Sequence, residues 1–575
     1  MAKRDRTPWR FLDEYRGSEF NGTWPTIPEL FRITASRLPT RRCFTRFDPE
    51  EQSFTYNEAL EAIQRTASYL HSKNLKKGDR VALTGKNSPE WAIAYLGILF
   101  AGGVVVPLDY QLKNDHLEEL IAFVDAKVLF VDSEKYDDLA RKGKGKVRER
   151  ISLAPENQNY ILDLPESTAG EAGIQADEHD LAAILFTSGT TGNFKGVMLT
   201  HHNFVSDCFL AQANMNIYSS DVFYALLPIH HAYTMLAVFL EAISVGAEIV
   251  FAKRLAVAQI LKELKQGQVT MFLAIPMLFN KMLKGLMRGV REKGAAVYGV
   301  VRALMFFSGG IKKLTGLNPG KVLFKGLLAK LSLDTNRICI CGGGPLPSTT
   351  FRQFNQLGID FVQGYGLTET SPILTLNPVD RYKEASVGQI IPEVEMKILA
   401  PDDRGIGEIA VRGPMVMQGY FQNEAATAES FTDDGRLRTG DVGYMDDENY
   451  LYLTGRKKSL IVTEGGKNVF PEEIEDHFQL YDEIEQIMVR GYEKDEAMKT
   501  EGIEALVYPA DEHFEALGKQ RGRPYSRTEI ETRIGEIVET VNRNLLPFQR
   551  IERVEVIDEP MEMTSTKKIK RHTVG

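Results

Sequence analysis

The chain has 575 residues, of which 43% are hydrophobic and 26% charged, with 48 Gly and 24 Pro. This composition excludes a disordered chain, a fibrous repeat protein and a small disulfide-stabilised protein. The formal net charge of −9 argues against a nucleic-acid-binding protein. A chain of this length needs at least two domains, because a single hydrophobic core does not extend over so many residues.

The first 180 residues alternate between helical and strand patterns. Apolar residues recur at helical spacing over 56–73, and short apolar runs at 79–84 and 127–132 predict strands. Residues 91–108 carry no charge, but Gly102 and its neighbouring glycine divide them into a helix and a buried strand, so we expect no membrane-spanning segment. Strands that alternate with helices indicate layered parallel α/β structure.

The same alternation continues through strand patterns at 182–186, 247–251 and 360–362, and it changes after about residue 400 to short strands and turns. We therefore predict an α/β protein with an α+β C-terminal part. Its large N-terminal domain, residues 1–457, consists of several lobes of parallel sheets and helices, and residues 458–575 form a small mobile domain.

Cysteine usage and the N-terminus bear on the cellular compartment. The four cysteines are too few and too scattered for a disulfide framework, so we expect free, buried thiols in a reducing compartment; they are Cys43, Cys208, Cys339 and Cys341. The first fifteen residues lack the apolar core of a signal peptide. These features predict a cytoplasmic protein.

Residues 281–330 differ from the rest of the chain in charge. They contain eleven Lys or Arg and one acid, Glu292, which gives the segment a net charge of +10. Apolar residues at helical spacing, interrupted by glycines, predict short basic amphipathic helices. Two interpretations stay open: peripheral docking on the inner, anionic face of a membrane, or the solvated face of an inserted helical hairpin. Docking predicts that charge reversal at Lys312 and Lys313 weakens vesicle binding.

The strongest local motif is TSGTTGNFKG at 187–196, which lies between two strand patterns. Its glycines let backbone N–H groups surround an anion, its hydroxyls add donors, and Lys195 adds positive charge. These are the properties that a polyphosphate site requires. A kinase or P-loop NTPase is disfavoured, because no Ser or Thr follows the lysine as in the Walker motif.

Several motifs in a fixed order resemble the adenylate-forming superfamily, which includes acyl-CoA synthetases, luciferases and the adenylation domains of peptide synthetases. The resemblance extends from about residue 28 to 571. Besides the 187–196 loop, the similar segments are LPIHH (227–231), CGGGPL (341–346), QGYGLTETSP (363–372), RTGD (438–441), YLTGR (452–456), GGKNVFPEEIE (465–475) and PMEMTSTKKIKR (560–571).

The resemblance implies an ATP site. The implied ATP- and AMP-binding residues are Thr187, Ser188, Gly189, Thr190, Thr191, Gly192, Lys195, Gly343, Gly344, Gln363, Gly364, Tyr365, Asp441 and Arg456. Among them, Tyr365 would stack on adenine, and Asp441 and Arg456 would bind the ribose hydroxyls. Thr187 and Glu369 would hold Mg²⁺ beside the phosphates, since a carboxylate is a suitable ligand for this cation.

The resemblance also implies the residues of the acyl-transfer chemistry. Thr368 would contact the α-phosphate, and His231 would gate the acyl carboxylate, with His230 as the competing register. Lys568 would bridge the carboxylate and the α-phosphate as a mobile point charge. The sequence departs from the family pattern at Lys567, where the family has glycine. This departure leaves the loop conformation open and makes Lys567 or Lys570 an alternative to Lys568.

Domain alternation follows from the resemblance as well. Lys458 would be the hinge, although Ser459 stands where the family has an acid. The CoA-binding face would carry Gly465, Gly466 and Lys467. Because this face and Lys568 cannot occupy one site together, the small domain would rotate about the hinge between the two half-reactions.

We therefore interpret the chain as a long-chain fatty acid:CoA ligase that uses ATP, Mg²⁺ and coenzyme A. The extra basic helices at 281–330 suggest the long acyl chain, because long-chain members carry helices near this point. The first alternative is an acyl-ACP synthetase or acyl-AMP ligase that loads a carrier protein. The second is a membrane-peripheral lipid-binding scaffold with an inactive site. The intact Lys195, Glu369, Asp441, Arg456 and Lys568 argue against this second alternative.

Overall fold

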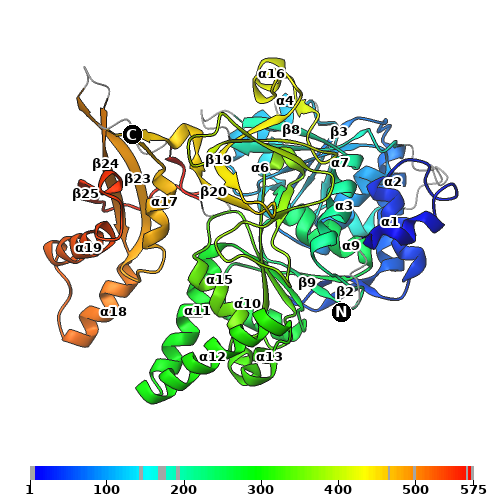
Figure 1. Ribbon diagram of the computed structural model, residues 1–575. Helices are drawn as coiled ribbons and strands as arrows, with labels where there is room; N and C mark the ends of the chain where they lie inside the picture. The colour runs from blue at the N-terminus through cyan, green and yellow to red at the C-terminus, as the bar shows by residue number, and fades with distance from the viewer. Residues whose placement is uncertain are drawn as a thin grey trace.

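The computed structural model describes residues 7–141, 147–165, 176–188, 194–463, 467–495, 500–564 and 568–571. A large N-terminal body is joined to a smaller C-terminal domain, drawn in orange and red in Figure 1. The two parts have separate hydrophobic cores, one with buried residues from Leu12 to Leu451 and the other from Ile461 to Ile551. A short 3-10 turn, η7 (Lys457–Ser459), lies between them at the predicted hinge.

The larger sheet of the body has nine strands among the described residues. Its central strands are parallel, whereas β2, β14 and β15 pair antiparallel at the two edges. In spatial order it comprises β15 (Gln389–Ile390), β14 (Ile373–Leu376), β13 (Asp360–Gly366), β12 (Ile338–Cys341), β11 (Met271–Ala274), β9 (Val222–Ala225), β10 (Glu248–Phe251), β1 (Arg42–Arg46) and β2 (Gln52–Thr55).

A second sheet has seven strands among the described residues and is parallel except for β8 and β18. Its order is β18 (Gly419–Tyr420), β8 (Phe194–Thr200), β7 (Leu181–Ser188), β4 (Val104–Leu108), β3 (Arg80–Thr84), β5 (Val128–Val131) and β6 (Glu149–Ser152). The antiparallel pairing of β7 with β8 brackets the 187–196 loop. Thr187 therefore faces Lys195 across the hairpin.

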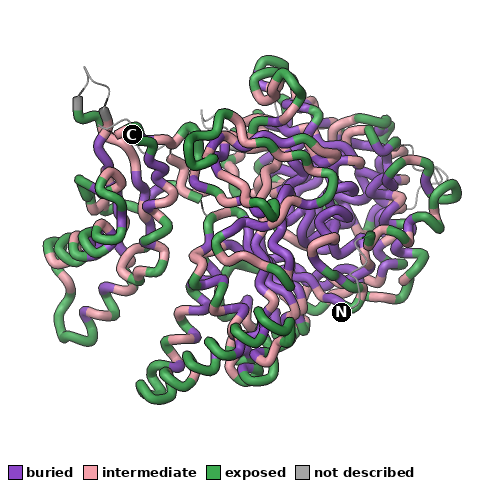
Figure 2. The backbone as a smooth tube through the Cα atoms, in the orientation of Figure 1, coloured by how far each residue is buried: buried purple, intermediate pink, exposed green. Residues whose placement is uncertain are grey.

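Helices between and around these sheets complete the α/β layers. They include α1 (Ile27–Arg37), α2 (Tyr56–Ser72), α3 (Pro89–Phe100), α4 (Asn114–Phe123), α7 (His201–Ala211), α9 (Glu241–Val245) and α10 (Val257–Gln266). Every residue of α3 is buried, and α3 leads through a glycine turn to β4, which confirms the prediction for residues 91–108. The buried centre of the body is coloured purple in Figure 2. The four cysteines are free and buried, as predicted.

The body ends in an antiparallel sheet of β16 (Glu395–Leu399), β17 (Gly407–Arg412), β19 (Leu437–Met445) and β20 (Leu451–Arg456), flanked by α16 (Glu424–Ser430). The C-terminal domain follows. Its elements are β21 (Ile461–Val462), β22 (Asn468–Val469), α17 (Pro471–Glu475), β23 (Ile484–Asp495), β24 (Thr500–Pro509), α18 (Asp511–Arg521), α19 (Arg527–Asn542) and β25 (Arg553–Val556). This arrangement agrees with the predicted α+β character of the C-terminal part.

Residues 276–331 form a helical lobe that projects from the body (Figure 1). It comprises α11 (Pro276–Arg291), α12 (Ala295–Thr315), α13 (Gly320–Leu323) and α14 (Lys325–Leu328), and it packs beside α15 (Ser348–Gln356). The expectation of short helices is wrong for α12, which continues through Gly299, Gly309 and Gly310. Gly309 is needed for packing, because a Cβ there would come within 2.7 Å of Gln356.

Helix α12 is also apolar and largely uncovered by the rest of the protein. The 21-residue helix α12 is long and apolar enough to cross a bilayer by length and composition, and only 17% of its apolar window is buried in the protein. Lys312 of this helix is itself buried and forms an ion pair with Asp360 at 2.7 Å. The sequence pattern did not distinguish this internal lysine from the solvated ones.

Candidate active site

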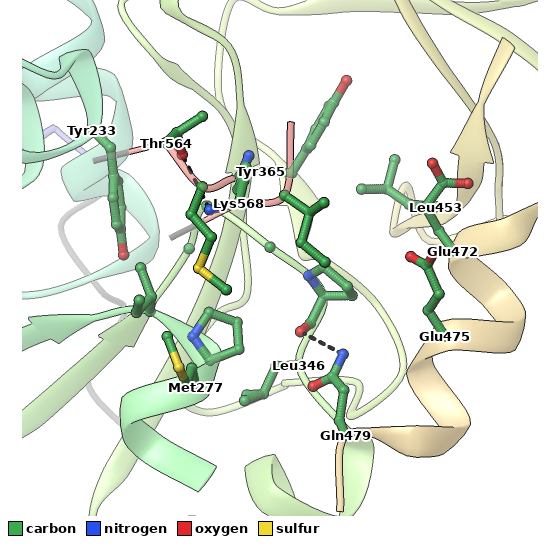
Figure 3. A pocket seen from close by; sticks show the side chains of 18 of the residues that line it. Tyr233, Met277, Leu346, Tyr365, Leu453, Glu472, Glu475, Gln479, Thr564 and Lys568 are labelled. Carbon is green, nitrogen blue, oxygen red and sulfur yellow. Dashed lines mark hydrogen bonds between the residues drawn. The ribbon is translucent and has the colours of Figure 1, made fainter. Parts of the chain in front are cut away.

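A cavity of 3080 Å³ lies between the N-terminal body and the C-terminal domain, and Figure 3 shows part of its wall. The structure brings most of the predicted site residues to this cavity. Those that line it are Thr187, Lys195, His231, Gly343, Gly344, Gln363, Gly364, Tyr365, Thr368, Glu369, Asp441, Arg456, Lys458 and Lys568. Gly189, Thr190, Thr191, Gly192, Gly465, Gly466 and Lys567 lie outside the described residues, as does the side chain of Ser188.

Asp441 connects three strands of the cavity wall. It stands opposite Arg456 in the β19–β20 pair, and the Arg456 Nε lies 2.9 Å from Asp441 Oδ1. The Tyr365 hydroxyl, from β13, donates a hydrogen bond of 2.7 Å to Asp441 Oδ2. Burial and the Asp441 charge raise the pKa of Tyr365, so its hydroxyl stays a donor. The carboxylate is thus fixed in orientation and keeps lone pairs that can accept from two neighbouring hydroxyl groups.

Glu369 and Lys195 define a second polar region. Glu369 lies in the turn η6 (Thr368–Thr370) after β13, and its Oε1 accepts a hydrogen bond of 2.9 Å from the Tyr420 hydroxyl. The Lys195 ammonium lies 4.7 Å from the centre of the Tyr420 ring, so this tyrosine holds both charged groups. A carboxylate and the Thr187 hydroxyl beside a lysine offer hard oxygen ligands that fit Mg²⁺ next to phosphate groups.

The glycines after β12 (Ile338–Cys341) have two different roles. A Cβ at Gly343 or Gly344 would meet its nearest protein atom only at 3.9 or 3.7 Å, so their open side faces the cavity and leaves room for a flat ligand. Gly342 instead is needed for packing, since a Cβ there would come within 2.7 Å of the Tyr233 ring. Tyr233 thereby becomes part of the cavity wall (Figure 3).

The two histidines of the LPIHH segment lie side by side, with ring centres 4.3 Å apart. His230 is buried, and its Nε2 lies 3.7 Å from Asp109 Oδ1. Burial, with smaller contributions from His230 and Lys568, lowers the pKa of His231 to about 3, while Asp109 opposes this. Both histidines line the cavity that Lys568 also lines. A neutral imidazole is therefore available at neutral pH to donate to or accept from a bound carboxylate.

Lys568 is presented by a short hairpin at the end of the chain. Its backbone N–H donates to Thr564 Oγ1 at 3.1 Å, and the Thr564 N–H donates back to the Lys568 carbonyl at 2.8 Å. Arg571 anchors the hairpin through two hydrogen bonds of 2.7 and 2.6 Å to the Glu475 carboxylate. Lys568 consequently projects into the cavity (Figure 3).

The Lys568 ammonium is accessible to water within the cavity, but protein atoms surround it on many sides. This partial dehydration, together with the charge of Arg456, lowers its pKa to about 8, while Asp441 opposes the change. The ammonium is therefore cationic at neutral pH and loses its charge as the pH rises through 8. A mobile cation of this kind can stabilise negative charge that develops between two anionic reactants.

We expect kcat/KM for adenylate formation to fall as the pH rises through 8, by about tenfold per pH unit, because only protonated Lys568 is active. Lys568→Arg keeps the positive charge at all these pH values, so the fall should disappear although the overall rate is lower. Pyrophosphate exchange measured across the pH range checks this. An unchanged alkaline fall in Lys568→Arg would assign it to another group.

Contacts between the lobe and the C-terminal domain fix the present domain orientation. Lys284 of α11 forms an ion pair with Asp482 at 2.7 Å. Gln479 accepts a hydrogen bond from Asn280 at 3.3 Å and donates one to the Pro345 carbonyl at 3.3 Å (Figure 3). In this orientation Lys568 lines the cavity and Lys467 does not. This difference agrees with two alternating faces, whereas the rotation about Lys458 stays a prediction.

Sequence reasoning missed several residues of the site. Tyr420, Tyr233 and Asp109 lie far from the phosphate loop in sequence, and each contacts a predicted residue only because the sheets bring their ends together. Arg571 was within the recognised C-terminal motif, but its partner Glu475 was not predicted to anchor it. Only the Lys-Ile-Lys-Arg spacing gave a signal for this anchor.

Comparison with known proteins agrees with this geometry. A family model described as AMP-binding enzyme matches residues 31–421. A relative from Bacillus subtilis, named a long-chain-fatty-acid–CoA ligase, is 26% identical over 556 residues, which cover 87% of this chain and 89% of the relative. A feruloyl-CoA synthase from Amycolatopsis is 28% identical over 472 residues, covering 80% of this chain and 84% of the relative.

A solved structure of ATP-bound MatB from Rhodopseudomonas palustris has the same fold, with a TM-score of 0.75 and 24% identity over 96% of this chain and 98% of that chain. Together with the fold and the site, the family match and the relatives define an ATP-dependent, AMP-forming CoA ligase that uses Mg²⁺ and coenzyme A. The chain belongs to the AMP-binding enzyme family.

Proposed function

We propose that this CoA ligase activates long-chain fatty acids. The observation that carries the proposal is the extent of the cavity, which continues from the nucleotide-binding residues to an apolar wall. This wall comes from the helical stretch α8 (Ala232–Thr234) and η4 (Met235–Leu240), from α10 and from α11; its residues include Tyr233, Ala237, Val257, Leu261, Met277 and Met282. An apolar wall of this kind favours a hydrocarbon chain, since each buried methylene contributes about 0.8 kcal/mol.

A buried carboxyl group directly after η4, that of Glu241, does not oppose the assignment. Glu241 lines the cavity and is 1% exposed, and burial raises its pKa to about 8, although a hydrogen bond from Gln212 acts against this. The side chain is therefore uncharged at neutral pH. An uncharged acid that hydrogen-bonds within the protein is compatible with an apolar substrate, whereas a carboxylate would not be.

The site residues support a reaction in two steps. The fatty carboxylate attacks the α-phosphorus of ATP; one P–O bond forms, and the bond to pyrophosphate breaks. Lys568 and Thr368 would bind the oxygens on which charge develops, while Asp441 and Arg456 would hold the nucleotide. Glu369 and Thr187 would hold Mg²⁺, which would neutralise phosphate charge. In the second step the CoA sulfur forms a thioester with the acyl carbon, AMP leaves, and the thiol proton passes to solvent.

The names of the relatives point to two different classes of acid substrate. The Bacillus subtilis relative supports a long-chain acid, whereas the Amycolatopsis relative points to an aromatic acid. A carrier protein is an alternative acceptor of the acyl group, because it presents the same phosphopantetheine thiol as coenzyme A. The experiment therefore varies both the acid and the acceptor.

We expect kcat/KM for AMP formation to rise roughly three- to fourfold per added methylene, until the chain reaches the length of palmitate or the cavity is filled. A series of saturated acids from acetate upward measures this chain-length dependence. Ferulic and benzoic acids are tested in parallel as aromatic substrates. Each acid is tested with coenzyme A and with carrier protein. A maximum at acetate or at an aromatic acid would refute the long-chain assignment. Faster transfer to carrier protein than to coenzyme A would favour the acyl-ACP synthetase.

A further inference from the structure

An apolar stripe runs along the outer face of helix α12. Successive spacings of three and four residues place six apolar side chains on one side of the helix: Val297, Val300, Leu304, Phe307, Ile311 and Leu314. Leu314 is 87% exposed, Phe307 65% and Val300 59%. Beyond the helix the same lobe also exposes Leu317, Val322 and Leu323. Figure 2 shows this part of the lobe largely in green.

A neighbouring side of α12 is fixed to the body. Met305, Ser308 and Lys312 are buried there, and the Lys312 ammonium contacts Asp360 at 2.7 Å and Asn355 Oδ1 at 2.8 Å. The helix is therefore a fixed part of the fold. Its inner face packs against the body, whereas its apolar stripe is exposed. An apolar surface of this extent on a well-packed helix is typical of an interaction site.

The lobe that carries the stripe is strongly basic. Its exposed basic residues are Lys281, Arg288, Arg291, Lys293, Arg302, Lys313, Lys321, Lys325 and Lys330. Glu292 is the one acid in residues 281–330. An amphipathic helix with an apolar face and a basic border is suited to the interface of a bilayer that contains anionic lipids. A second copy of the chain is a poorer partner, because a symmetric contact would bring the same basic residues against one another.

We propose that this lobe docks on an anionic phospholipid bilayer, with the α12 stripe inserted among the acyl chains and the basic residues at the headgroups. The buried Lys312–Asp360 pair holds α12 against the body, so the helix lies in the surface and does not cross it. Residues of the adjacent α11 line the cavity. If the proposed function holds, docking therefore places an acyl pocket next to the phase into which fatty acids partition. The docking itself does not depend on the substrate.

The test is co-sedimentation of the full chain with phosphatidylcholine vesicles, prepared with and without phosphatidylglycerol. One variant removes the apolar contact, Phe307→Ser with Leu314→Ser. A second reverses the basic border, Lys313→Glu with Lys321→Glu and Lys325→Glu. Controls carry Leu546→Ser, or Lys76→Glu with Lys113→Glu and Lys519→Glu, on exposed sites outside the lobe. Circular dichroism and adenylation of a short soluble acid show that each variant is folded.

The wild-type chain and both controls should bind only the vesicles that contain phosphatidylglycerol, and added salt should weaken this binding. The charge-reversed variant should bind roughly a hundredfold more weakly, since each basic residue contributes about tenfold or less to surface attraction. The apolar variant should bind at least about tenfold more weakly. Equal binding by the wild type and both lobe variants would overturn the proposal. A wild-type dimer in sedimentation velocity that dissociates in the apolar variant, without vesicle binding, would overturn it in favour of self-association.

Discussion

Replacing Lys568 by alanine is expected to slow adenylate formation by about 10³-fold and to leave thioester formation from supplied acyl-AMP within about twofold of wild type. Lys568 lines the cavity, and its ammonium interacts electrostatically with Arg456 and His231. Its charge would be needed where two anions meet, but not for attack of a thiol on the finished adenylate. Pyrophosphate exchange and CoA consumption from synthetic acyl-AMP measure the two steps separately.

The matched control is Lys570→Ala, in the same hairpin. The Lys570 ammonium pairs with Glu562 at 3.4 Å, so its loss should change neither step by more than about twofold. Loss of both steps in Lys568→Ala would contradict the two-face arrangement. A larger effect at Lys570 than at Lys568 would show that the alternative register of the C-terminal motif is the active one.

Replacing Asp441 by alanine is expected to lower kcat/KM for ATP by about 10³-fold, with Asp441→Asn intermediate at about 10². Alanine removes both acceptor oxygens and releases Tyr365 and Arg456 from their fixed positions. Asparagine retains one carbonyl oxygen but replaces the other by a donor, which cannot accept from a ribose hydroxyl. Steady-state kinetics with varied ATP, together with direct nucleotide binding, provide the measurement.

Glu395→Gln is the control for this change. Glu395 belongs to the same sheet and forms hydrogen bonds of 2.7 and 2.8 Å to Arg412, but it lies on the exposed surface outside the cavity. We expect it to leave ATP kinetics unchanged, because exposed ion pairs contribute little. Unaltered ATP binding in Asp441→Ala would show that Asp441 is not part of the nucleotide site. An equal loss of kcat/KM for ATP in Glu395→Gln would show the same.

Local periodicity and turn chemistry explain how much of the fold was predictable. The uncharged stretch at 91–108 contains its own glycine turn, and it forms α3 and β4 as expected. The loop at 187–196 could be predicted as a polyphosphate site for a similar reason, because its glycines, hydroxyls and lysine lie within ten residues between two strand patterns. Site residues that are neighbours in the sequence can be predicted before the fold is known.

The residues that were missed depend on contacts between distant segments. Tyr420 holds Glu369 from a two-residue strand paired with β8, and no local pattern distinguishes it from other tyrosines. The sequence around Lys312 does not distinguish it from Lys313, which follows it directly and is exposed. Only its place on the inner face of α12 pairs Lys312 with Asp360. The glycines of α12 suggested interruption, and the close approach of Gly309 to Gln356 of α15 is not visible in the sequence.

The most direct test of the central claim is to identify the products formed in sequence by one sample of enzyme. With ATP, Mg²⁺ and palmitate but no coenzyme A, mass spectrometry should detect enzyme-bound palmitoyl-AMP and released pyrophosphate. Addition of coenzyme A should then convert the adenylate to palmitoyl-CoA and AMP in equal amounts. Formation of ADP and phosphate, or an adenylate that is not transferred to coenzyme A, would contradict the account.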